Sequence, residues 1–387
     1  MSTRRLLALI ASVVGVIVAG TAIAVAAIGN GPVPRRESLA VAIHQALAAP
    51  AVTGISASIS YTNNLIDATD FQGPTDPLLQ GASGRLWLTD TPGDQQLRIE
   101  LQTDNGDAQV VYDNGHFSIY DPAAGEAYEG TLPAKAHGAA HHRARAASAD
   151  RIPSIAAITR ALTRLSKHAV LSGAIPSDVG GQAAYTVKIA PERNGGLVGD
   201  LQLAWDALRG IPLRIAIYAK GDTTPVLQLE ATDISYGPVS SSVFDVSPPP
   251  GTRIIQLSVP TGAHKSSARA RRAVARALPF TLDDPATSGG LARTSVGRLG
   301  RDGALLFYGH DLSGVAVLEQ VSHGSATAAP AMRHGGFSIP TVSINGVTAQ
   351  QLQTPLGTVL RFTRSGVAYT VIGSVTPATA DAVARGL

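Results

Sequence analysis

The sequence predicts a β-rich α+β fold in which a strongly curved antiparallel sheet forms an incomplete β-barrel with covering helices. Three observations support this prediction. The 387 residues include 40 Gly and 24 Pro, a content typical of β folds with many turns. Many short segments alternate apolar and polar side chains, as strands with one buried face do. Two helical patterns accompany these strands, so we expect their apolar faces to enclose a cleft rather than a closed core.

Residues 1–30 begin the chain with an apolar segment. Arg4 and Arg5 precede an uncharged run from Leu6 to Ile28. A secretory signal has an apolar region of ~7–15 residues, whereas a membrane-spanning helix needs about 20. We therefore favour an uncleaved transmembrane helix in the cell membrane, with the bulk of the chain extracytoplasmic. The segment AVA at 24–26 resembles a cleavage site, so a cleaved signal and a secreted protein remain the alternative.

Two helices are expected within residues 36–255, the first predicted domain. Leu39, Ile43 and Leu47 recur every four residues, which places them on one helix face. The second helix lies within Ile152–Val170. Its apolar stripe consists of Ile155, Ile158, Leu162 and Leu165.

Strands fill the remainder of this domain. Asn114-Gly115 separates two of them, a pair typical of a tight hairpin. Residues 134–150 read AKAHGAAHHRARAASAD, have no apolar period, and are predicted to form a disordered loop inserted into the domain. Further strands are expected at Tyr185–Ile189, Leu197–Trp205, Pro212–Ala219 and Val226–Thr232.

The C-terminal part of the chain is predicted to form a basic linker and a small α+β domain. Residues 256–278 carry several Lys and Arg side chains and no acidic one, as a solvated linker or a short exposed helix between domains does. Residues 279–387 form the predicted domain, in which Asn345-Gly346 indicates a second hairpin. The terminal helix, Pro377–Leu387, is expected to pack on the strands through Ala378, Ala382 and Val383.

Residue types that usually carry catalysis form no recognisable constellation. The chain has no cysteine, which excludes disulfides and thiolate chemistry. The patterns G-x-S-x-G, S-x-x-K, H-E-x-x-H and G-x-G-x-x-G are absent. Asp283 and Asp284 precede Pro285, and a helix start or a solvated turn explains them better than acid–base chemistry. We therefore expect a protein that is not an enzyme and that needs no cofactor.

Two basic segments, residues 134–150 and 256–278, are candidate binding sites. His137, His141 and His142 are the best metal candidates, but a solvated loop explains them better because no acidic or cysteine partner lies near. The basic linker suits nucleic acid, yet the predicted export argues against that partner. Anionic headgroups or an acidic protein are more accessible, and a solvated linker remains the simpler interpretation.

The apolar faces of the strands form the candidate ligand site. Leu201–Tyr218 reads LQLAWDALRGIPLRIAIY, two alternating runs around a turn, whose apolar residues are expected to meet on one face across the hairpin. Ordinary core packing is the alternative at every position. The predicted ligand-binding residues are Ile55, Ile59, Leu86, Leu88, Leu97, Ile99, Leu101, Leu201, Leu203, Trp205, Leu213, Ile215, Ile217, Leu227 and Leu229.

Two segments of the first predicted domain carry a recognisable pattern. Its residues are Asp206, Ile211–Arg214, Leu227–Leu229, Tyr236, Phe244 and Pro249–Gly251, with Gly84, Leu97–Ile99, Asp113–Gly115, Phe117 and Tyr120–Pro122 upstream. With these residues, Gly199–Ile254 resembles the second half of the LolA/LolB/RseB superfamily of lipoprotein carriers, and Ala82–Pro122 resembles the first half. Gly309–Gln320 and Gly366–Leu387 resemble the small C-terminal domain of RseB/MucB regulators.

The resemblance implies a LolA-like half-barrel whose helices cover an apolar cavity. Such proteins hold lipid or the acyl chains of lipoproteins without covalent chemistry, so this chain is predicted to be a non-enzymatic extracytoplasmic binding protein. The alternative is an envelope-stress regulator of RseB type, which binds a membrane anti-sigma factor or another envelope protein. A third hypothesis, an exported hydrolase, needs a nucleophile that the sequence does not identify.

Overall fold

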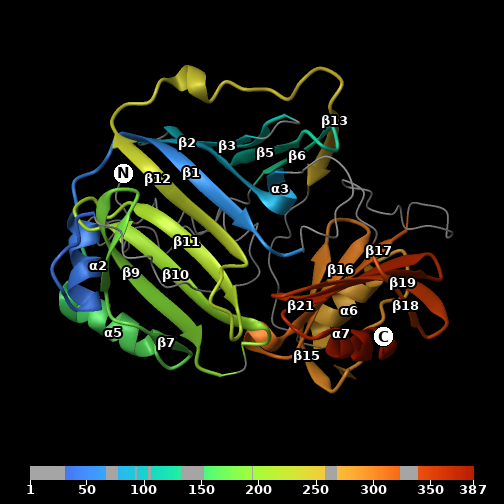
Figure 1. Cartoon of the computed structure of the whole chain (residues 1–387). Coiled ribbons are helices and arrows are strands. Elements are labelled where there is room, and N and C mark those ends of the chain that lie inside the picture. Colours follow the sequence, from blue (N-terminus) through green and yellow to red (C-terminus); the bar gives the residue numbers. More distant parts are fainter. Residues whose placement is uncertain are drawn as a thin grey trace. The chain divides into compact units, whose positions relative to one another are not determined.

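Two β-sheets, each with its own apolar core, account for most of the described chain (Figure 1). The computed structural model describes residues 31–66, 77–91, 94–102, 106–131, 152–193, 195–257, 268–322 and 339–387. The chain divides into two compact units, and each is described by itself. The first comprises the described residues within Met1–Asn64, Pro74–Arg193 and Asp200–Leu257, and the second those within Leu65–Gly73, Asn194–Gly199 and Ser258–Leu387.

Two predicted segments lie outside the described residues: the N-terminal apolar run, 1–30, and the inserted loop, 134–150. In the part of the chain that the structure describes, no helix is both long enough and apolar enough to cross a membrane.

The first unit contains one sheet and three helices among its described residues. The helices are α2 (Leu39–Ala48), α3 (Pro77–Gln80) and α5 (Ile155–Leu165). The strands are β1 (Gly54–Asn63), β2 (Gly81–Thr91), β3 (Asp94–Gln102), β4 (Ala108–Asp113), β5 (His116–Asp121), β6 (Glu126–Thr131), β7 (Ala169–Leu171), β8 (Ile175–Val179), β9 (Gln182–Pro191), β10 (Val198–Asp206), β11 (Pro212–Ala219), β12 (Leu227–Tyr236) and β13 (Arg253–Leu257).

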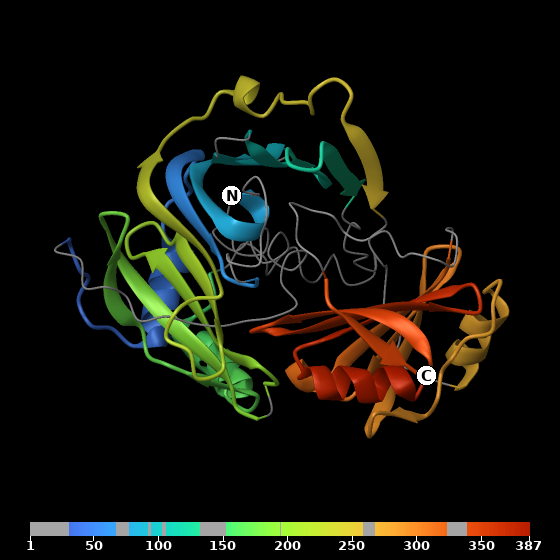
Figure 2. The ribbon, with the colours of Figure 1, turned by 45° about the vertical axis from the view of Figure 1, so that its right-hand side comes forward.

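The sheet curls into a half-barrel (Figure 2). Its order is β13-β6-β5-β4-β3-β2-β1-β12-β11-β10-β9-β7, and β8 pairs with β9. Strand β13 runs parallel to β6, whereas the other neighbours of defined register are antiparallel. The central pair, β1 with β12, joins the two ends of the unit's sequence, with Ile55 opposite Tyr236.

Both long helices of this unit, which the sequence predicts, begin at a serine cap. The Ser38 hydroxyl accepts from the Val41 amide at 3.3 Å, and the Ser154 hydroxyl accepts from the Ala157 amide at the same distance. The burial of α2 differs from the predicted stripe, because its alanines lie closest to the sheet and Leu39, Ile43 and Leu47 are only half-buried.

The hairpin between β10 and β11 is held by one buried carboxylate. Asp206 accepts from the amides of Leu208 at 2.7 Å and Arg209 at 2.9 Å, and from the hydroxyl of Tyr236 at 2.6 Å. The Arg209 guanidinium pairs with the same carboxylate at 3.3 Å and lies 4.2 Å from the ring centroid of Tyr236. The sequence motif that carries the family resemblance therefore includes a turn cap, which is structural.

The second unit is an eight-stranded antiparallel sheet in the order β14-β15-β16-β17-β21-β20-β19-β18. Its helices are α6 (Ala268–Arg276) and α7 (Pro377–Arg385). Its strands are β14 (Thr287–Ser288), β15 (Leu291–Leu299), β16 (Gly303–Tyr308), β17 (Val315–Val321), β18 (Thr341–Ile344), β19 (Val347–Thr354), β20 (Gly357–Arg364) and β21 (Val367–Gly373).

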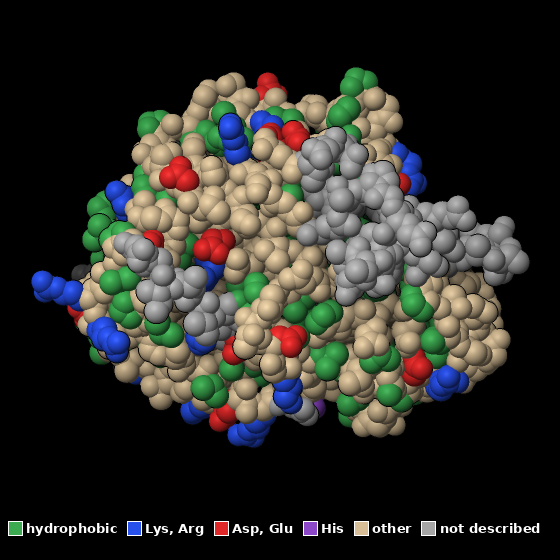
Figure 3. Space-filling model, in the orientation of Figure 1, with side chains coloured by type: hydrophobic (Ala, Val, Ile, Leu, Met, Phe, Trp, Pro, Cys, Tyr) green, Lys and Arg blue, Asp and Glu red, His purple; other side chains and the backbone are tan. Residues whose placement is uncertain are grey.

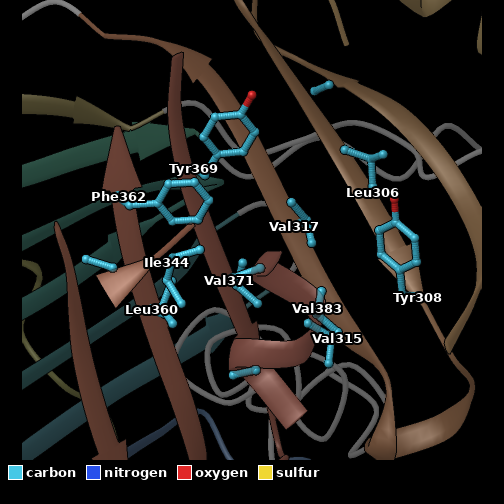
Figure 4. Packing of buried hydrophobic residues seen from close by; sticks show 14 of the residues in the cluster. Leu306, Tyr308, Val315, Val317, Ile344, Leu360, Phe362, Tyr369, Val371 and Val383 are labelled. Carbon is cyan, nitrogen blue, oxygen red and sulfur yellow. The ribbon is translucent and has the colours of Figure 1, made fainter. Parts of the chain in front are cut away.

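Helix α7 covers the core of this sheet, where Val383 lies beside Val315 and Val371 (Figure 4). The predicted contact residues Ala378 and Ala382 are wrong, since both are exposed. The helix starts at the Thr376 cap, and that start sets which residues face inward at three- and four-residue spacing. The residues that it buries are Ala380, Val383 and Ala384.

Both Asn-Gly hairpins are confirmed. Asn114 and Gly115 have φ values of 45° and 101° between β4 and β5. Asn345 and Gly346 have φ values of 48° and 84° between β18 and β19. Two consecutive positive φ angles match the right-handed twist of paired strands, which is why this dipeptide specifies the turn.

Replacing Asp206 with alanine should destabilise the first unit by about 2–4 kcal/mol, because two turn amides, the Tyr236 hydroxyl and a guanidinium all lose their acceptor. Urea unfolding followed through the fluorescence of Trp87 and Trp205 measures this loss. Asp222→Ala, at an exposed position in the next hairpin, is the control and should change stability by no more than ~0.5 kcal/mol. Equal effects of the two substitutions would contradict the assigned role.

Candidate functional site

Apolar side chains form continuous rows across β12, β1, β2, β3 and β4. Directly paired residues project from the same face of an antiparallel sheet, so the strand register fixes these rows. The first row runs Tyr236, Ile55, Leu88, Leu97, Tyr112. The second row runs Ile234, Ala57, Leu86, Ile99, Val110. All ten side chains belong to one apolar cluster, called here the row cluster.

Most of the predicted ligand-binding residues come together in the row cluster. Ile59 and Leu101 extend it, beside the small residues Gly84 and Ala108. The predicted residues in the cluster are Ile55, Ile59, Leu88, Leu97, Ile99, Leu101 and Leu213, which are buried, and Leu86 and Leu229, which are half-buried.

A short helix provides the one contact that the described helices make with this cluster. Leu78 of α3 packs on it. The carbonyl of Leu78 accepts from the Asn63 amide nitrogen at 2.7 Å and from the Tyr61 hydroxyl at 3.4 Å. Strands also contribute to the cluster, and these residues are Val179, Ala184, Ala204 and Leu213 of β8 to β11, with Ile211 directly before β11. Among the described helices, α3 is thus the one that packs on the rows, whereas α2 packs on the face of β9 and β10.

The apolar face of β10 packs under α2 instead. Leu203 and Trp205 form a second cluster with Ala42 and Ala46 of that helix, and the rings of Trp205 and Tyr185 lie 6.1 Å apart. The predicted hairpin face is thus divided, because Leu213 belongs to the row cluster and Trp205 does not.

The remaining predicted residues lie on β10, β11 and β12 outside both clusters. Ile217 and Leu227 are buried opposite each other. Ile215 is half-buried opposite Leu229, and Leu201 is half-buried opposite Ile189.

Strands β10 and β11 carry a buried polar pair that was not predicted from the sequence. The Arg214 guanidinium donates to the Gln202 side-chain oxygen at 2.7 Å, and the two residues are 6% and 0% exposed. Burial raises the pKa of Glu230, which lies opposite Arg214, although that guanidinium opposes the change. Burial also raises the pKa of the Tyr218 hydroxyl to about 12. Arg214 stands at an alternate position of an otherwise apolar strand, and that position was the available signal.

Hollows lined by described residues lie away from the row cluster. One of about 520 Å³ lies between the end of α6 and the β15–β16 turn and is lined by Arg276, Arg298 and Arg301 with neighbours. Another, of about 560 Å³, lies over α5. Neither is lined by a predicted ligand-binding residue.

The second unit contains an acidic cluster in which Glu319 is buried and Asp283 and Asp284 are half-buried. Asp283 pairs with Arg364 at 2.8 Å and accepts from the Tyr369 hydroxyl at 2.5 Å, while its amide donates to Glu319 at 3.0 Å. Asp284 pairs with Arg271 at 3.5 Å and Arg293 at 3.0 Å. The interpretation of these two aspartates as a helix start or solvated turn is therefore wrong, since they anchor the segment before β14 to the sheet.

Glu319 is fully buried in a stripe that continues Val315 and Val317 of β17. Burial raises the pKa of its carboxyl to about 8, and the nearby Asp283 and Asp284 carboxylates raise it further, while the Asp283 amide and Arg364 oppose the shift. The folded protein therefore keeps this carboxyl protonated at neutral pH.

Metal ligation finds no support in the described residues, where no three His, Asp or Glu side chains gather as a metal would require. The histidine candidates at 137, 141 and 142 lie outside that part of the chain.

The described residues define a β-rich α+β protein whose first unit is a curled half-barrel sheet with few helices. No protein-family model and no curated protein sequence matches the chain. Solved structures similar to it include MucB in complex with MucA(peri), at 16% identity and a TM-score of 0.43, covering 90% of this chain and 95% of that one.

Two further solved structures are similar to this chain. The Pseudomonas aeruginosa MucA/MucB complex has 15% identity and a TM-score of 0.43, covering 89% of this chain and 94% of that one. A lipoprotein-sorting domain from Vibrio parahaemolyticus has 10% identity and a TM-score of 0.19, covering 54% and 96%. These are the kinds of protein that the sequence resembles.

Glu319→Gln should raise the melting temperature of the second unit more at alkaline than at acidic pH. The unfolded chain releases this proton near its ordinary pKa of 4.5, whereas the folded protein holds it up to about pH 8. Stability is therefore lost progressively as pH rises through that interval, and glutamine, which cannot ionise, avoids the loss. Scanning calorimetry at about pH 5 and about pH 9 measures the difference.

Asp302→Asn, in the exposed β15–β16 turn, is the matched control and should show no such pH dependence. An advantage of Glu319→Gln that is the same at both pH values would contradict a protonated Glu319.

Proposed function

We propose that this chain is a non-enzymatic extracytoplasmic binding protein that holds an acyl chain of a lipid or lipoprotein against the row cluster. The observation that carries the proposal is the set of apolar rows across five strands, on which Leu78 of α3 is the one contact from a described helix. Neighbouring strands lie about 4.8 Å apart, so the rows span roughly 20 Å, wide enough for an extended hydrocarbon chain.

The polar groups at the margin of the cluster are already engaged. The Tyr236 hydroxyl donates to Asp206, and the Tyr61 hydroxyl donates to the Leu78 carbonyl. A ligand over the rows would therefore meet mainly hydrocarbon, which favours an acyl chain over a peptide with backbone groups to satisfy. Half-buried members such as Leu86 and Leu229 offer surface for that contact.

The cellular location is part of the same proposal. The uncharged run from Leu6 to Ile28 would anchor the chain in the cell membrane and leave both units outside the cytoplasm. In that position an acyl chain would be supplied by the adjacent lipid or by a lipoprotein.

A regulator of RseB type is the second candidate. The two segments that resemble the RseB C-terminal domain lie side by side, because β17 pairs with β21 and α7 packs on both in one core. MucB, to which the chain is similar, has been solved with MucA. The second unit would then bind a membrane anti-sigma factor or another envelope protein, and an acyl ligand would modulate that binding.

Leu86→Gln and Leu229→Gln should each weaken uptake of a fluorescent fatty acid at least tenfold. Each change removes about 1.5–3 kcal/mol of apolar contact from the row cluster. Native mass spectrometry with organic extraction of the purified chain first tests for co-purified lipid, and fluorescence titration then measures affinity. Leu208→Gln, at a turn residue that is 75% exposed, is the control and should bind normally.

Unchanged circular dichroism and melting temperature would show that the variants fold. A lipid-free mass together with no uptake of fatty acid by the unaltered chain would mean that the rows are only a core, and would reject the carrier function.

The regulator hypothesis predicts hydrogen-exchange protection within residues 268–387 when the full chain meets the extracytoplasmic segment of a membrane anti-sigma factor from the same organism. Calorimetry with and without added fatty acid should then give different affinities, because a regulatory ligand must couple to the partner. Protection confined to the first unit, or an affinity unaffected by fatty acid, would argue against this form of regulation.

A further inference from the structure

We propose that α5 and the adjoining strand β7 form a docking surface for an anionic lipid bilayer. This surface, called here the α5 surface, comprises the exposed residues of 152–175. None of its residues belongs to the row cluster, so the proposal stands or falls independently of acyl binding.

Exposed apolar side chains are concentrated in this short segment. Ten large apolar residues are exposed in the described part of the chain, and five of them lie within 152–175. These five lie on or shortly before α5 and on the two strands that follow it, and exposed apolar residues that gather in one part of a protein mark an interaction site more often than scattered single residues do. The five are Ile152, Ile155, Leu165, Val170 and Ile175.

Helix α5 leaves these side chains outside because it buries little. Of its eleven residues, Ile158 is the buried one. The predicted apolar stripe therefore covers the sheet only at its centre, and its end members Ile155 and Leu165 are each 43% exposed. Strand β7 adds Val170 at the edge of the sheet, where β7 pairs with β9 alone.

The charge of the same segment is of one sign. Residues 152–177 contain Arg160, Arg164 and Lys167, together with His168, and no acidic residue. The three permanent cations are exposed and form no ion pair with described residues. The neighbouring acid, Glu192, lies 3.9 Å from Arg193.

The geometry places the cations on the outer side of the helix. Arg160 and Arg164 are four residues apart and thus share a face of the helix. Viewed along the helix axis, this face lies roughly 120–160° from the buried Ile158. The Arg164 guanidinium donates to the Arg160 carbonyl at 3.3 Å, which holds that side chain along the helix. Hydrophobic and Lys or Arg side chains lie next to one another over the region of α2 and α5 (Figure 3).

A bilayer with anionic headgroups fits this combination. Cations on the outer face attract the negative surface. Leu165, which follows Arg164 directly and is 43% exposed, and Val170 of β7 are the apolar side chains that can enter the boundary between headgroups and acyl chains next to that face. Another part of the protein has exposed cations without such apolar neighbours. Arg276 and Arg298 in the second unit are exposed and form no ion pair with described residues. Among the described residues of that unit, Ile372 is the one large apolar residue that is exposed. These arginines provide the control.

A single fluorophore can test the proposal in the full chain, because the chain has no cysteine. Ala161 on α5 and Ala273 on α6 are exposed helical residues with arginines near them in the sequence. Each is replaced in turn, as Ala161→Cys or Ala273→Cys. Each is labelled with an environment-sensitive dye and placed with vesicles of phosphatidylcholine alone or of phosphatidylcholine and phosphatidylglycerol. Both labels share the N-terminal segment, so anchoring by residues 1–30 affects them alike.

The α5 label should shift its emission to the blue with phosphatidylglycerol vesicles and not with phosphatidylcholine, whereas the α6 label should not respond. Raising the salt from about 0.1 M to about 1 M should reverse the shift, because the Debye length falls from about 10 Å to about 3 Å. Arg160→Gln with Arg164→Gln should weaken the response roughly 30-fold, since each cation near the surface contributes about fivefold in affinity. Arg276→Gln with Arg298→Gln should leave it unchanged.

No shift with phosphatidylglycerol, an equal shift at both labels, or an equal shift with neutral vesicles would overturn the proposal. A response of the α5 label to an acidic amphipathic peptide in the absence of any response to vesicles would also overturn it, and would assign the surface to a protein partner. A loss of fatty-acid binding with the vesicle response intact would reject the acyl-carrier function and leave the α5 surface in place.

Discussion

The first unit depends on cross-strand pairing that places apolar residues of five strands on one face. The alternation of each strand alone creates only a stripe of side chains, but the register of β12, β1, β2, β3 and β4 aligns the stripes into rows. A shift of one residue in any of these pairings would turn that strand's apolar side chains to the opposite face. The register therefore determines both the stability of the sheet and the gathering of these apolar side chains into one row cluster.

The two units solve the burial of polar groups differently. In the first unit, Asp206 is buried with partners on its turn and on Tyr236, so its charge is fully compensated at one end of the sheet. In the second unit, Glu319 lies in an apolar stripe and is kept neutral by its surroundings. Charged pairs through Asp283 and Asp284 tie the segment before β14 to that sheet.

Much of the fold follows from local patterns in the sequence. The two Asn-Gly hairpins, the serine-capped helices and the strands β9 to β12 were predictable because turn chemistry and alternation act over a few residues. Strands β15 and β16 were missed, since arginines and glycines interrupt the alternation of LARTSVGRL and GALLFY is a short apolar run with no period. The packing phase of α7 depends on where its Thr376 cap falls, which a repeat of alanines does not reveal.

The candidate site was predictable in part for the same reason. Period-two alternation identifies which residues share a face of one strand, so the row cluster on β1, β2 and β3 was anticipated. Alternation does not indicate which face of the sheet a helix will cover. Trp205 packs under α2, whereas Leu213 belongs to the row cluster, and the alternation of the hairpin does not predict this difference. Buried polar residues such as Gln202 and Arg214 need long-range pairing to be recognised, and a single sequence does not provide that information.

The order of strands has a consequence for biosynthesis. Strand β1 pairs with β12, and β6 pairs with β13, so the first and the last of the six early strands each have a partner close to the end of the first unit. During synthesis the apolar rows of β1 to β4 leave the ribosome well before β12 exists to complete them. The chain passes through a stage with an open sheet edge and an uncovered apolar face, in which binding by a chaperone would compete with aggregation. Closing such long loops is also slow, so this unit is expected to mature late, once β13 has been made.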